Sequence, residues 1–267
     1  MAGLIITIIV IILGIILALS RPKKKPVLVS PDIIRDTLQK RVAYYVRLSA
    51  GEQTRFQQEV DAFIREIKIT GIKTEVTDED RVLLAASAII PIFAFPGWKY
   101  PNLNEVLVYP DQFDDRFSLE EGNADRHIQG MVGSGALHRM MVISQTALRD
   151  GFSNKTDKEN TAIHEFVHLI DKTDGDIDGV PELLLQNQCV RSWLKLMLEE
   201  IEAIKKNESD INPYGATNEA EFFAVAAEYF FERPVLFKQK NPELYAVMER
   251  IFRQRPETDS RKVTGAE

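Results

Sequence analysis

The chain has 267 residues, of which 45% are hydrophobic and 27% are charged, which is ordinary for a folded soluble domain. The formal net charge is −7, so the basic excess typical of a nucleic-acid-binding surface is missing and we expect no nucleic-acid partner. Cys189 is the single cysteine, which excludes an intrachain disulfide and a cysteine-based metal site.

The N-terminus departs from this ordinary composition. Ala2 to Leu19 is apolar apart from Thr7, and a helix of this length spans about 27 Å, close to the hydrocarbon thickness of a bilayer. Arg21 and Lys23–Lys25 follow at once. A signal peptide would begin with basic residues and have a shorter apolar core, and a buried core helix would not be apolar on every face. We therefore predict a single-pass membrane anchor, with residues 21 onward on the cytoplasmic side.

Three amphipathic helices are predicted after a short basic linker. Ser30 and Pro31 are typical of a helix start, and apolar residues then recur at helical spacing. A second helix is expected to reach about Ile69, where Gly71 ends it. A third begins at Thr77 and stops near Pro91.

The middle of the chain predicts strands and loops, and the last part predicts helices. Prolines at 91, 96, 101 and 110 prevent a long helix there. Strands are expected at Glu105–Tyr109 and Met140–Ser144, with a polar, glycine-rich segment at 111–138 between them. The helices expected after that are 157–172, 181–206, 217–232 and 241–254.

The sequence HEFVH at residues 164–168 carries the clearest chemistry. His164 and His168 are one helical turn apart and share a face, so their imidazoles can bind one tetrahedral cation. Glu165 is placed to reach a water held by that cation and to act as a general base. The alternative to a metal site is a pair of surface histidines on an amphipathic helix, and the flanking apolar residues argue against it.

A third metal ligand is required, and spacing alone leaves two places open. Asp174 follows the motif, but the glycine turn that usually precedes such a ligand is absent. The second place is the predicted helix at 217–232, where four glutamates interrupt an apolar run: Glu219, Glu221, Glu228 and Glu232. Glu221 and Glu228 share a face, so one could bind the metal while the other supports a histidine.

HEFVHLID together with the later YGATNEAEFFAVAAEYFF resembles the Mlc titration factor A family of zinc peptidases, the glucose-regulated metallopeptidases. The likeness covers roughly residues 30–256, and the motifs also resemble the catalytic domain of anthrax lethal factor, a gluzincin. This resemblance implies one Zn²⁺ per chain, held by His164, His168 and Glu221, with Glu165 as catalytic base. It also implies that the hydroxyl of Tyr214 stabilises the oxyanion and that the strand at 140–144 aligns an extended substrate.

The fold expected from these parts is an α+β, mainly helical zincin-like domain behind one transmembrane helix. Its divisions are a transmembrane anchor (1–20), a basic linker (21–29), a metallopeptidase domain (30–256) and a polar tail (257–267). Within that domain, a helical part (30–90) precedes the catalytic part (91–256). The expected function is hydrolysis of peptide or protein substrates, aminopeptidase-like by resemblance. The alternative is a membrane-tethered protein that sequesters a cytoplasmic transcriptional regulator.

Overall fold

The computed structural model of the chain describes residues 27–111, 130–132, 139–153, 158–181, 184 and 190–256. The anchor predicted at 2–19, most of the basic linker and the tail at 257–267 lie outside these described residues. Within them, no helix combines the length and the apolar character that a membrane crossing needs.

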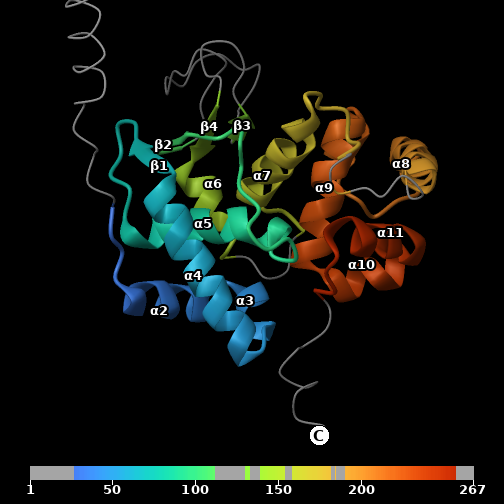
Figure 1. Cartoon of the computed structure of the whole chain (residues 1–267). Coiled ribbons are helices and arrows are strands. Elements are labelled where there is room, and N and C mark those ends of the chain that lie inside the picture. Colours follow the sequence, from blue (N-terminus) through green and yellow to red (C-terminus); the bar gives the residue numbers. More distant parts are fainter. Residues whose placement is uncertain are drawn as a thin grey trace, which may run out of the picture.

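Four helices make up the first part of the described chain, in the lower left of Figure 1. They are α2 (Pro31–Arg41), α3 (Ala43–Arg47), α4 (Ala50–Glu66) and α5 (Asp78–Ile92). α4 and α5 each begin with a capping box, in which Ser49 pairs with Glu52 and Thr77 pairs with Asp80. These reciprocal hydrogen bonds satisfy backbone groups at the helix start and fix where each helix begins.

The sheet is small and mixed, with four strands in the order β1-β2-β4-β3. The strands are β1 (Lys68–Gly71), β2 (Glu105–Tyr109), β3 (Gly130–Val132) and β4 (Met140–Ser144). β1, β2 and β4 run parallel, whereas β3 is antiparallel to β4 and occupies the edge of this sheet. α7 (Thr161–Asp171) packs beside β3 and β4, so this edge of the sheet lies next to the helix that carries HEFVH (Figure 1).

The last part of the chain is helical, and its elements from residue 190 onward lie to the right in Figure 1. Its elements are α6 (Gln145–Asp150), α7 (Thr161–Asp171), the short 3₁₀ helix η2 (Lys172–Asp174), α8 (Val190–Lys205), the 3₁₀ helix η3 (Pro213–Ala216), α9 (Glu219–Glu232), α10 (Pro234–Lys240) and α11 (Pro242–Phe252). α7 packs against α5 on one side and against α9 on another, which places it in the interior.

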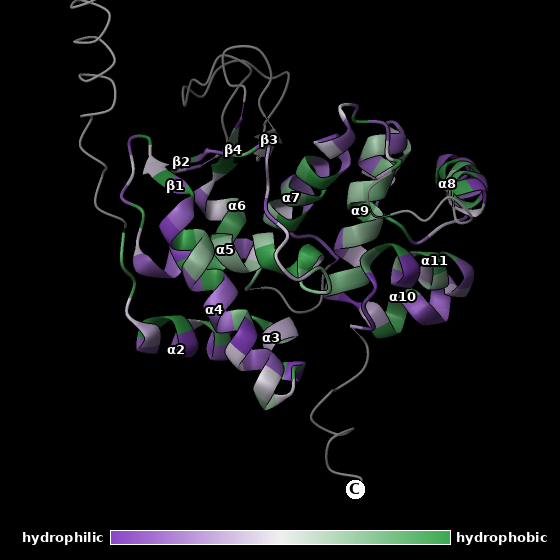
Figure 2. Cartoon of the chain, viewed as in Figure 1, coloured by the Kyte–Doolittle hydropathy of each residue, from purple (hydrophilic) through white to green (hydrophobic). Residues whose placement is uncertain are grey.

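One hydrophobic core joins the two parts. It extends from Val29 before α2 to Phe252 at the end of α11. α5 and α9 are its central helices, since every residue of α5 from Val82 to Ile92 and every residue of α9 from Phe222 to Phe231 is buried. Figure 2 shows the contrast with α8, which carries hydrophobic and hydrophilic residues on different faces. A glutamate on α9 therefore faces protein rather than solvent wherever it falls within the buried stretch.

The mainly helical α+β class is confirmed, and the strands at 105–109 and 140–144 lie where the sequence predicts them. The last four predicted helices correspond to α7, α8, α9 and α11. The first predicted helix is divided at Val42 into α2 and α3, and α6, α10 and the edge strand β3 were not predicted. These elements are short, so their sequence periodicity is too brief to recognise.

The predicted second helix ends earlier than expected. α4 stops at Glu66, and Lys68–Gly71 forms β1 because it pairs in parallel with β2. Lys68 Nζ lies 2.5 Å from Glu105 Oε1, and Thr70 donates to the same oxygen at 2.6 Å. These cross-strand contacts outweigh local helix preference.

The third helix was predicted to stop near Pro91, yet α5 continues through it to Ile92. Proline removes one backbone donor and disturbs the preceding turn. Gln254 compensates at this end, because its Nε2 donates to the carbonyls of Ile90 at 2.9 Å and Pro91 at 3.2 Å. A residue far along the chain thus satisfies carbonyls that the helix leaves open.

Candidate metal centre

α7 is capped by Asn160 and carries the two histidines on one face. The Oδ1 of Asn160 accepts a hydrogen bond from the backbone N–H of Ile163 at 3.1 Å, which caps the helix. His164 and His168 follow one turn apart, and their side chains are only 10% and 11% exposed. Glu165 is 5% exposed. The motif therefore sits in the protein interior, which excludes the alternative of two surface histidines.

α9 brings its glutamates to the same place. Asn218 caps this helix by accepting from the backbone N–H of Glu221 at 2.9 Å. Glu221 in the first turn and Glu228 two turns later both point toward His164. Because α7 and α9 pack directly against each other, ligands from two separate segments converge.

Three ligand atoms lie close enough to share one cation. His164 Nε2 is 2.9 Å from Glu221 Oε2 and 3.0 Å from His168 Nε2, and His168 Nε2 is 3.4 Å from Glu221 Oε2. A tetrahedral cation with ligands at about 2.0–2.1 Å needs its ligand atoms about 3.4 Å apart. The donor set of two imidazoles and one carboxylate therefore fits a small divalent metal ion.

Glu228 supports the site from behind the ligands. Its Oε1 lies 2.7 Å from His164 Nδ1, the ring nitrogen opposite the one that faces Glu221. Its other oxygen accepts from the backbone N–H of Asn160 at 2.5 Å. A carboxylate on the far nitrogen keeps the near nitrogen unprotonated for a metal. Of the two glutamates left open by the sequence, the structure places Glu221 with the two histidines and Glu228 at the far nitrogen of His164.

The electrostatics of the cluster favour a positive charge at its centre. Burial lowers the pKa of His164, but the carboxylates of Glu228 and Glu221 outweigh it and raise that pKa to about 10. Burial raises the pKa of Glu221, whereas hydrogen bonds with His164 and His168 bring it down to about 2. The cluster thus holds an ionised carboxylate against the imidazole of His164, which attracts a proton, and a metal ion would take that proton's place.

Glu165 is packed against the edge strand of the sheet. A methyl group on Gly130 of β3 would lie 2.6 Å from both Cγ and Oε1 of Glu165, so only glycine lets the strand pass this close. Burial raises the pKa of Glu165, and this effect is larger than the lowering by the nearby His164 and His168. Sequence reasoning missed Gly130, although it lies in the glycine-rich segment, because the segment does not show which glycine meets the helix.

Tyr214 and Asp174 take different positions. Tyr214, in η3, has its ring centroid 6.0 Å from that of His164 and is 53% exposed, so it borders the site from the solvent side. Asp174, at the end of η2, is exposed and does not belong to the group of convergent ligand atoms. The structure therefore places Glu221, and not Asp174, with the two histidines.

The expectation that β4 aligns the substrate is wrong. β4 pairs with β2 on one side and with β3 on the other, so its backbone is occupied by the sheet. Among the strands that the structure describes, β3 is the one at the edge, and it is the one that lies against Glu165. The sequence could not show this, because β3 has three residues and no recognisable pattern.

A helix with two histidines and an adjacent glutamate, and a second helix with a third ligand, define the metallopeptidase class of site. Residues 20–253 match the family described as glucose-regulated metallo-peptidase M90, and the chain belongs to that family. The predicted resemblance is thereby confirmed.

Named relatives agree with this membership. The chain is 29% identical to Mlc titration factor A of Salmonella arizonae over 228 residues, covering 79% of this chain and 87% of that protein. It is 30% identical to Mlc titration factor A of Enterobacter sp. (strain 638) over 226 residues, covering 78% and 82%. An uncharacterized protein of Synechocystis sp. is 29% identical over 225 residues, covering 79% and 80%.

Proposed function

We propose that the chain is a zinc-dependent peptidase that hydrolyses peptide bonds. The observation that carries this proposal is the convergence of His164, His168 and Glu221 beside the buried carboxylate of Glu165. A site that only holds a structural metal is closed by four protein ligands and needs no base. Three ligands next to a carboxylate leave a coordination position for water and a group that can accept its proton.

Each residue has a separate task in the reaction. A zinc ion held by the three ligands would supply Lewis acidity, which acidifies water and polarises a carbonyl. Glu165 takes the proton from the attacking water and delivers it to the leaving amine. The pKa of Glu165 is raised by burial, which makes its carboxylate a better proton acceptor. The hydroxyl of Tyr214 donates a hydrogen bond to the negative charge that develops on the carbonyl oxygen.

The substrate is proposed to lie along β3. An extended peptide can pair with the backbone of an edge strand without needing particular side chains. Gly130 brings that backbone against Glu165, so a peptide paired with β3 would pass close to the base. The family resemblance favours aminopeptidase-like action on such a peptide.

Glu165→Gln is the direct test of catalysis. The amide keeps the size of the side chain but cannot accept the proton, so we expect zinc content to stay at that of the wild type and turnover of a chromogenic peptide panel to fall by about 1,000-fold. Glu219→Gln, at an exposed glutamate of α9, is the matched control and should leave turnover unchanged. Undiminished cleavage by Glu165→Gln would exclude the proposed base.

Tyr214→Phe tests the oxyanion role. Loss of a buried donor of this kind costs about 10²–10³ in kcat, but Tyr214 is half exposed and water can replace its hydroxyl in part. We expect kcat to fall by about tenfold with KM nearly constant. A variant that changes KM alone would show that Tyr214 contacts substrate without stabilising the charge.

Residues 2–19 are proposed to anchor this peptidase in a membrane with the domain on the cytoplasmic side. The support is the length of the apolar run and the cations that follow it. Membrane fractionation of the full chain and of a chain starting at Val27 tests this. Recovery of both in the soluble fraction would refute the anchor.

A second candidate function is suggested by the name titration factor that relatives carry. In this alternative the chain binds a cytoplasmic transcriptional regulator and its catalysis is weak or absent. Capture of the same regulator by the wild type and by Glu165→Gln, with no peptide cleaved by either, would favour it over the peptidase.

A further inference from the structure

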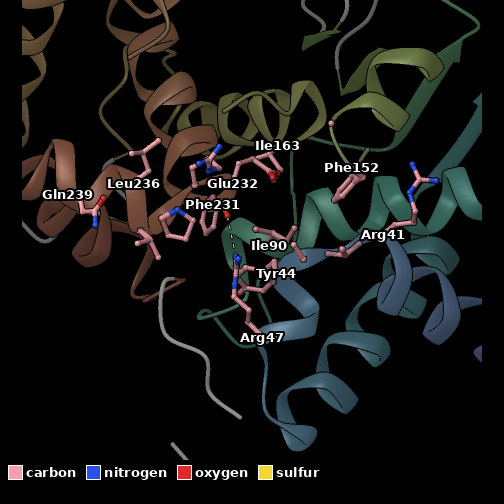
Figure 3. A pocket seen from close by; sticks show the side chains of 16 residues that line it. Arg41, Tyr44, Arg47, Ile90, Phe152, Ile163, Phe231, Glu232, Leu236 and Gln239 are labelled. Carbon is pink, nitrogen blue, oxygen red and sulfur yellow. Dashed lines mark hydrogen bonds between the residues drawn. The ribbon is translucent and has the colours of Figure 1, made fainter. Parts of the chain in front are cut away.

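The two ends of α7 differ in what lies beside them. Near its start, Ile163 lines a cavity of about 440 Å³, whose other walls come from α3, α5 and the junction of α9 with α10 (Figure 3). None of the three ligand residues is among those that line this cavity. At its other end, α7 meets the loop at Gly179 through its last residue, Asp171, one turn after the ligand His168.

Asp171 is a buried acid that uses one of its two carboxylate oxygens. The residue is 0% exposed. Its Oδ2 accepts a hydrogen bond from the backbone N–H of Gly179 at 2.8 Å. Its Oδ1 is buried and has no hydrogen-bond partner among the residues that the structure describes. A buried carboxylate oxygen without a donor is costly, so a donor is expected beside it.

His168 has a buried nitrogen in the same condition. Its Nε2 faces the other ligand atoms, 3.0 Å from His164 Nε2 and 3.4 Å from Glu221 Oε2. Its Nδ1 is buried and, within the described part of the chain, makes no hydrogen bond. His164 differs, because Glu228 Oε1 lies 2.7 Å from its Nδ1. In the described residues, therefore, His164 has a carboxylate in contact with its far nitrogen and His168 does not.

The two unpartnered atoms belong to neighbouring side chains of α7. Residues three apart on a helix share a face, and helical side chains lean toward the start of the helix, so the carboxylate of Asp171 lies over the turn that carries His168. Burial raises the pKa of Asp171 to about 6, against the opposing effects of the Gly179 N–H and of His168, so the two side chains interact electrostatically. One buried water can accept from Nδ1 and donate to Oδ1, which would satisfy both atoms.

The other oxygen of Asp171 connects α7 with the second helix of the metal centre. Gly179, which accepts no larger residue, has a φ of +76°, and a methyl group there would lie 2.3 Å from the carbonyl oxygen of Glu219. The carbonyl of Gly179 accepts from Trp193 Nε1 at 2.6 Å. The loop therefore lies closely against the first turn of α9, two residues before the ligand Glu221. Asp171 thus joins the end of α7 to the start of α9.

We propose that Asp171 is a positioning residue for the metal centre, which orients His168 through one bridging water and holds the loop at Gly179 against α9. Its Oδ1 keeps the proton of His168 on Nδ1, so that Nε2 is free to bind the metal ion. Glu228 does the same for His164 by direct contact. The inference rests on the metal site of the proposed function and does not depend on peptide hydrolysis.

Asp171→Asn separates the two tasks of this side chain. The amide oxygen still accepts from Gly179, which leaves the NH₂ group toward His168 and favours a proton on Nε2 in place of Nδ1. We expect the zinc affinity of the full-length chain in detergent, measured against a competing chelator, to fall about 10- to 100-fold. Asp178→Asn, at an exposed aspartate of the same loop that accepts from the N–H of Val180, is the matched control and should keep its zinc affinity. Equal affinities in the two variants would overturn the proposal.

Trp193→Phe tests whether the loop alone accounts for the effect. It removes the donor to the carbonyl of Gly179 and leaves Asp171 intact. We expect Trp193→Phe to lower the urea midpoint of the metal-free chain while zinc affinity changes by less than about threefold. Asp171→Asn should show the reverse, a nearly constant midpoint and weaker zinc binding. If Trp193→Phe weakened zinc binding as much as Asp171→Asn, the carboxylate would not be the group that positions His168.

The Nδ1 proton gives a readout that is independent of affinity. In the full-length chain saturated with zinc and labelled with ¹⁵N-histidine, NMR should show an Nδ1–H signal from each histidine ligand that appears only with zinc. Glu228→Gln should shift the signal of His164, and Asp171→Asn should shift or remove that of His168. The absence of the His168 signal from the wild type, or a signal that Asp171→Asn leaves unchanged, would overturn the proposal.

The outcomes for the proposed function and for Asp171 can be told apart. A wild type that bound no zinc would refute the metal site and the role of Asp171 together. A wild type that bound zinc and lost no affinity in Asp171→Asn would refute the role of Asp171 alone. Zinc binding that weakens in Asp171→Asn, in a chain that cleaves no peptide, would refute the peptidase and keep the positioning role.

Discussion

Two polar clusters in this protein each contain a buried carboxylate and differ in the groups that neutralise it. In the first, Asp80 is 1% exposed and accepts hydrogen bonds from Thr77, Gln145 and Arg149. In the second, the imidazoles of His164 and His168 face carboxylates of Glu221 and Glu228. The first cluster contains its own permanent cation, Arg149, within 2.7 Å of Asp80.

The second cluster contains no such cation. Within the described residues, no ion pair joins a lysine or arginine to Glu221 or Glu228, and their partners there are histidines. Buried charges require an opposite charge, and an imidazole supplies one only when protonated. The comparison teaches that a cluster with a permanent cation stabilises the fold by itself, whereas a cluster in which carboxylates face imidazoles could exchange a proton for a metal ion.

The largest effect is expected from removing the ligand that the metal cluster takes from α9. Glu221→Ala should lower zinc affinity on the order of 1,000-fold, equivalent to about 4 kcal/mol, and zinc should no longer raise the unfolding temperature. Metal analysis and thermal unfolding with and without chelator measure both. Asp174→Ala is the control, since Asp174 was the other ligand candidate in the sequence and is exposed in the structure. Loss of zinc in the control and not in Glu221→Ala would reverse the assignment.

The second largest effect is expected for the stability of the cluster around Asp80, which contains its own cation. Asp80→Asn should lower the free energy of unfolding at pH 7 by about 3 kcal/mol while zinc affinity stays constant, because the change leaves Arg149 without its buried partner. Asp78→Asn, in the same first turn but exposed, should cost far less. Urea unfolding measures both. If Asp80→Asn reduced zinc affinity as much as stability, the two clusters would not be separate.

The same variant should change the response to acid. Burial raises the pKa of Asp80, but hydrogen bonds from Arg149, Thr77 and Gln145 outweigh it, so the folded pKa lies below the ordinary value for an aspartate. The stability that this carboxylate contributes is therefore complete above about pH 4 and is lost as the pH falls through the lower folded pKa. Below about pH 4 the difference in stability between the wild type and Asp80→Asn should shrink.

The smallest effect should come from the contact between the sheet and the metal cluster. Gly130→Ala places a methyl group against Glu165, so we expect kcat to fall about tenfold with full zinc content. Gly51→Ala is the control, since a methyl group there meets no atom within 4 Å. Steady-state kinetics measures kcat, and metal analysis measures the zinc content. An unchanged kcat would show that the base does not need this close approach.

The sequence predicts the site better than it predicts the fold around it. Metal ligands need fixed residue types at fixed helical spacing, so His164, Glu165 and His168 stand out in a single chain. Glu221 required the family resemblance, because a glutamate on a helix looks the same whether it binds metal or water. Gly130 and Asn160 carried no such signal, since glycine and asparagine occur in many loops and caps.

Two features of the fold that the sequence did not predict, β1 and the continuation of α5 past Pro91, have a common cause. β1 forms because β2 lies beside Lys68–Gly71, and α5 passes Pro91 because Gln254 meets its last carbonyls. In both cases the deciding partner is distant in the sequence. Local periodicity predicts long helices such as α7 and α9, but it contains no information about such distant partners.

The origin of the ligands on two helices has a mechanical consequence. With two ligands on α7 and one on α9, a bound ion would close a loop through residues 172–220. α9 could then separate from α7 only after the ion is released, whereas α8 lies inside the loop and could unfold while the ion stays in place. Metal would thus divide the molecule into a part that opens only with metal release and a part that can open alone.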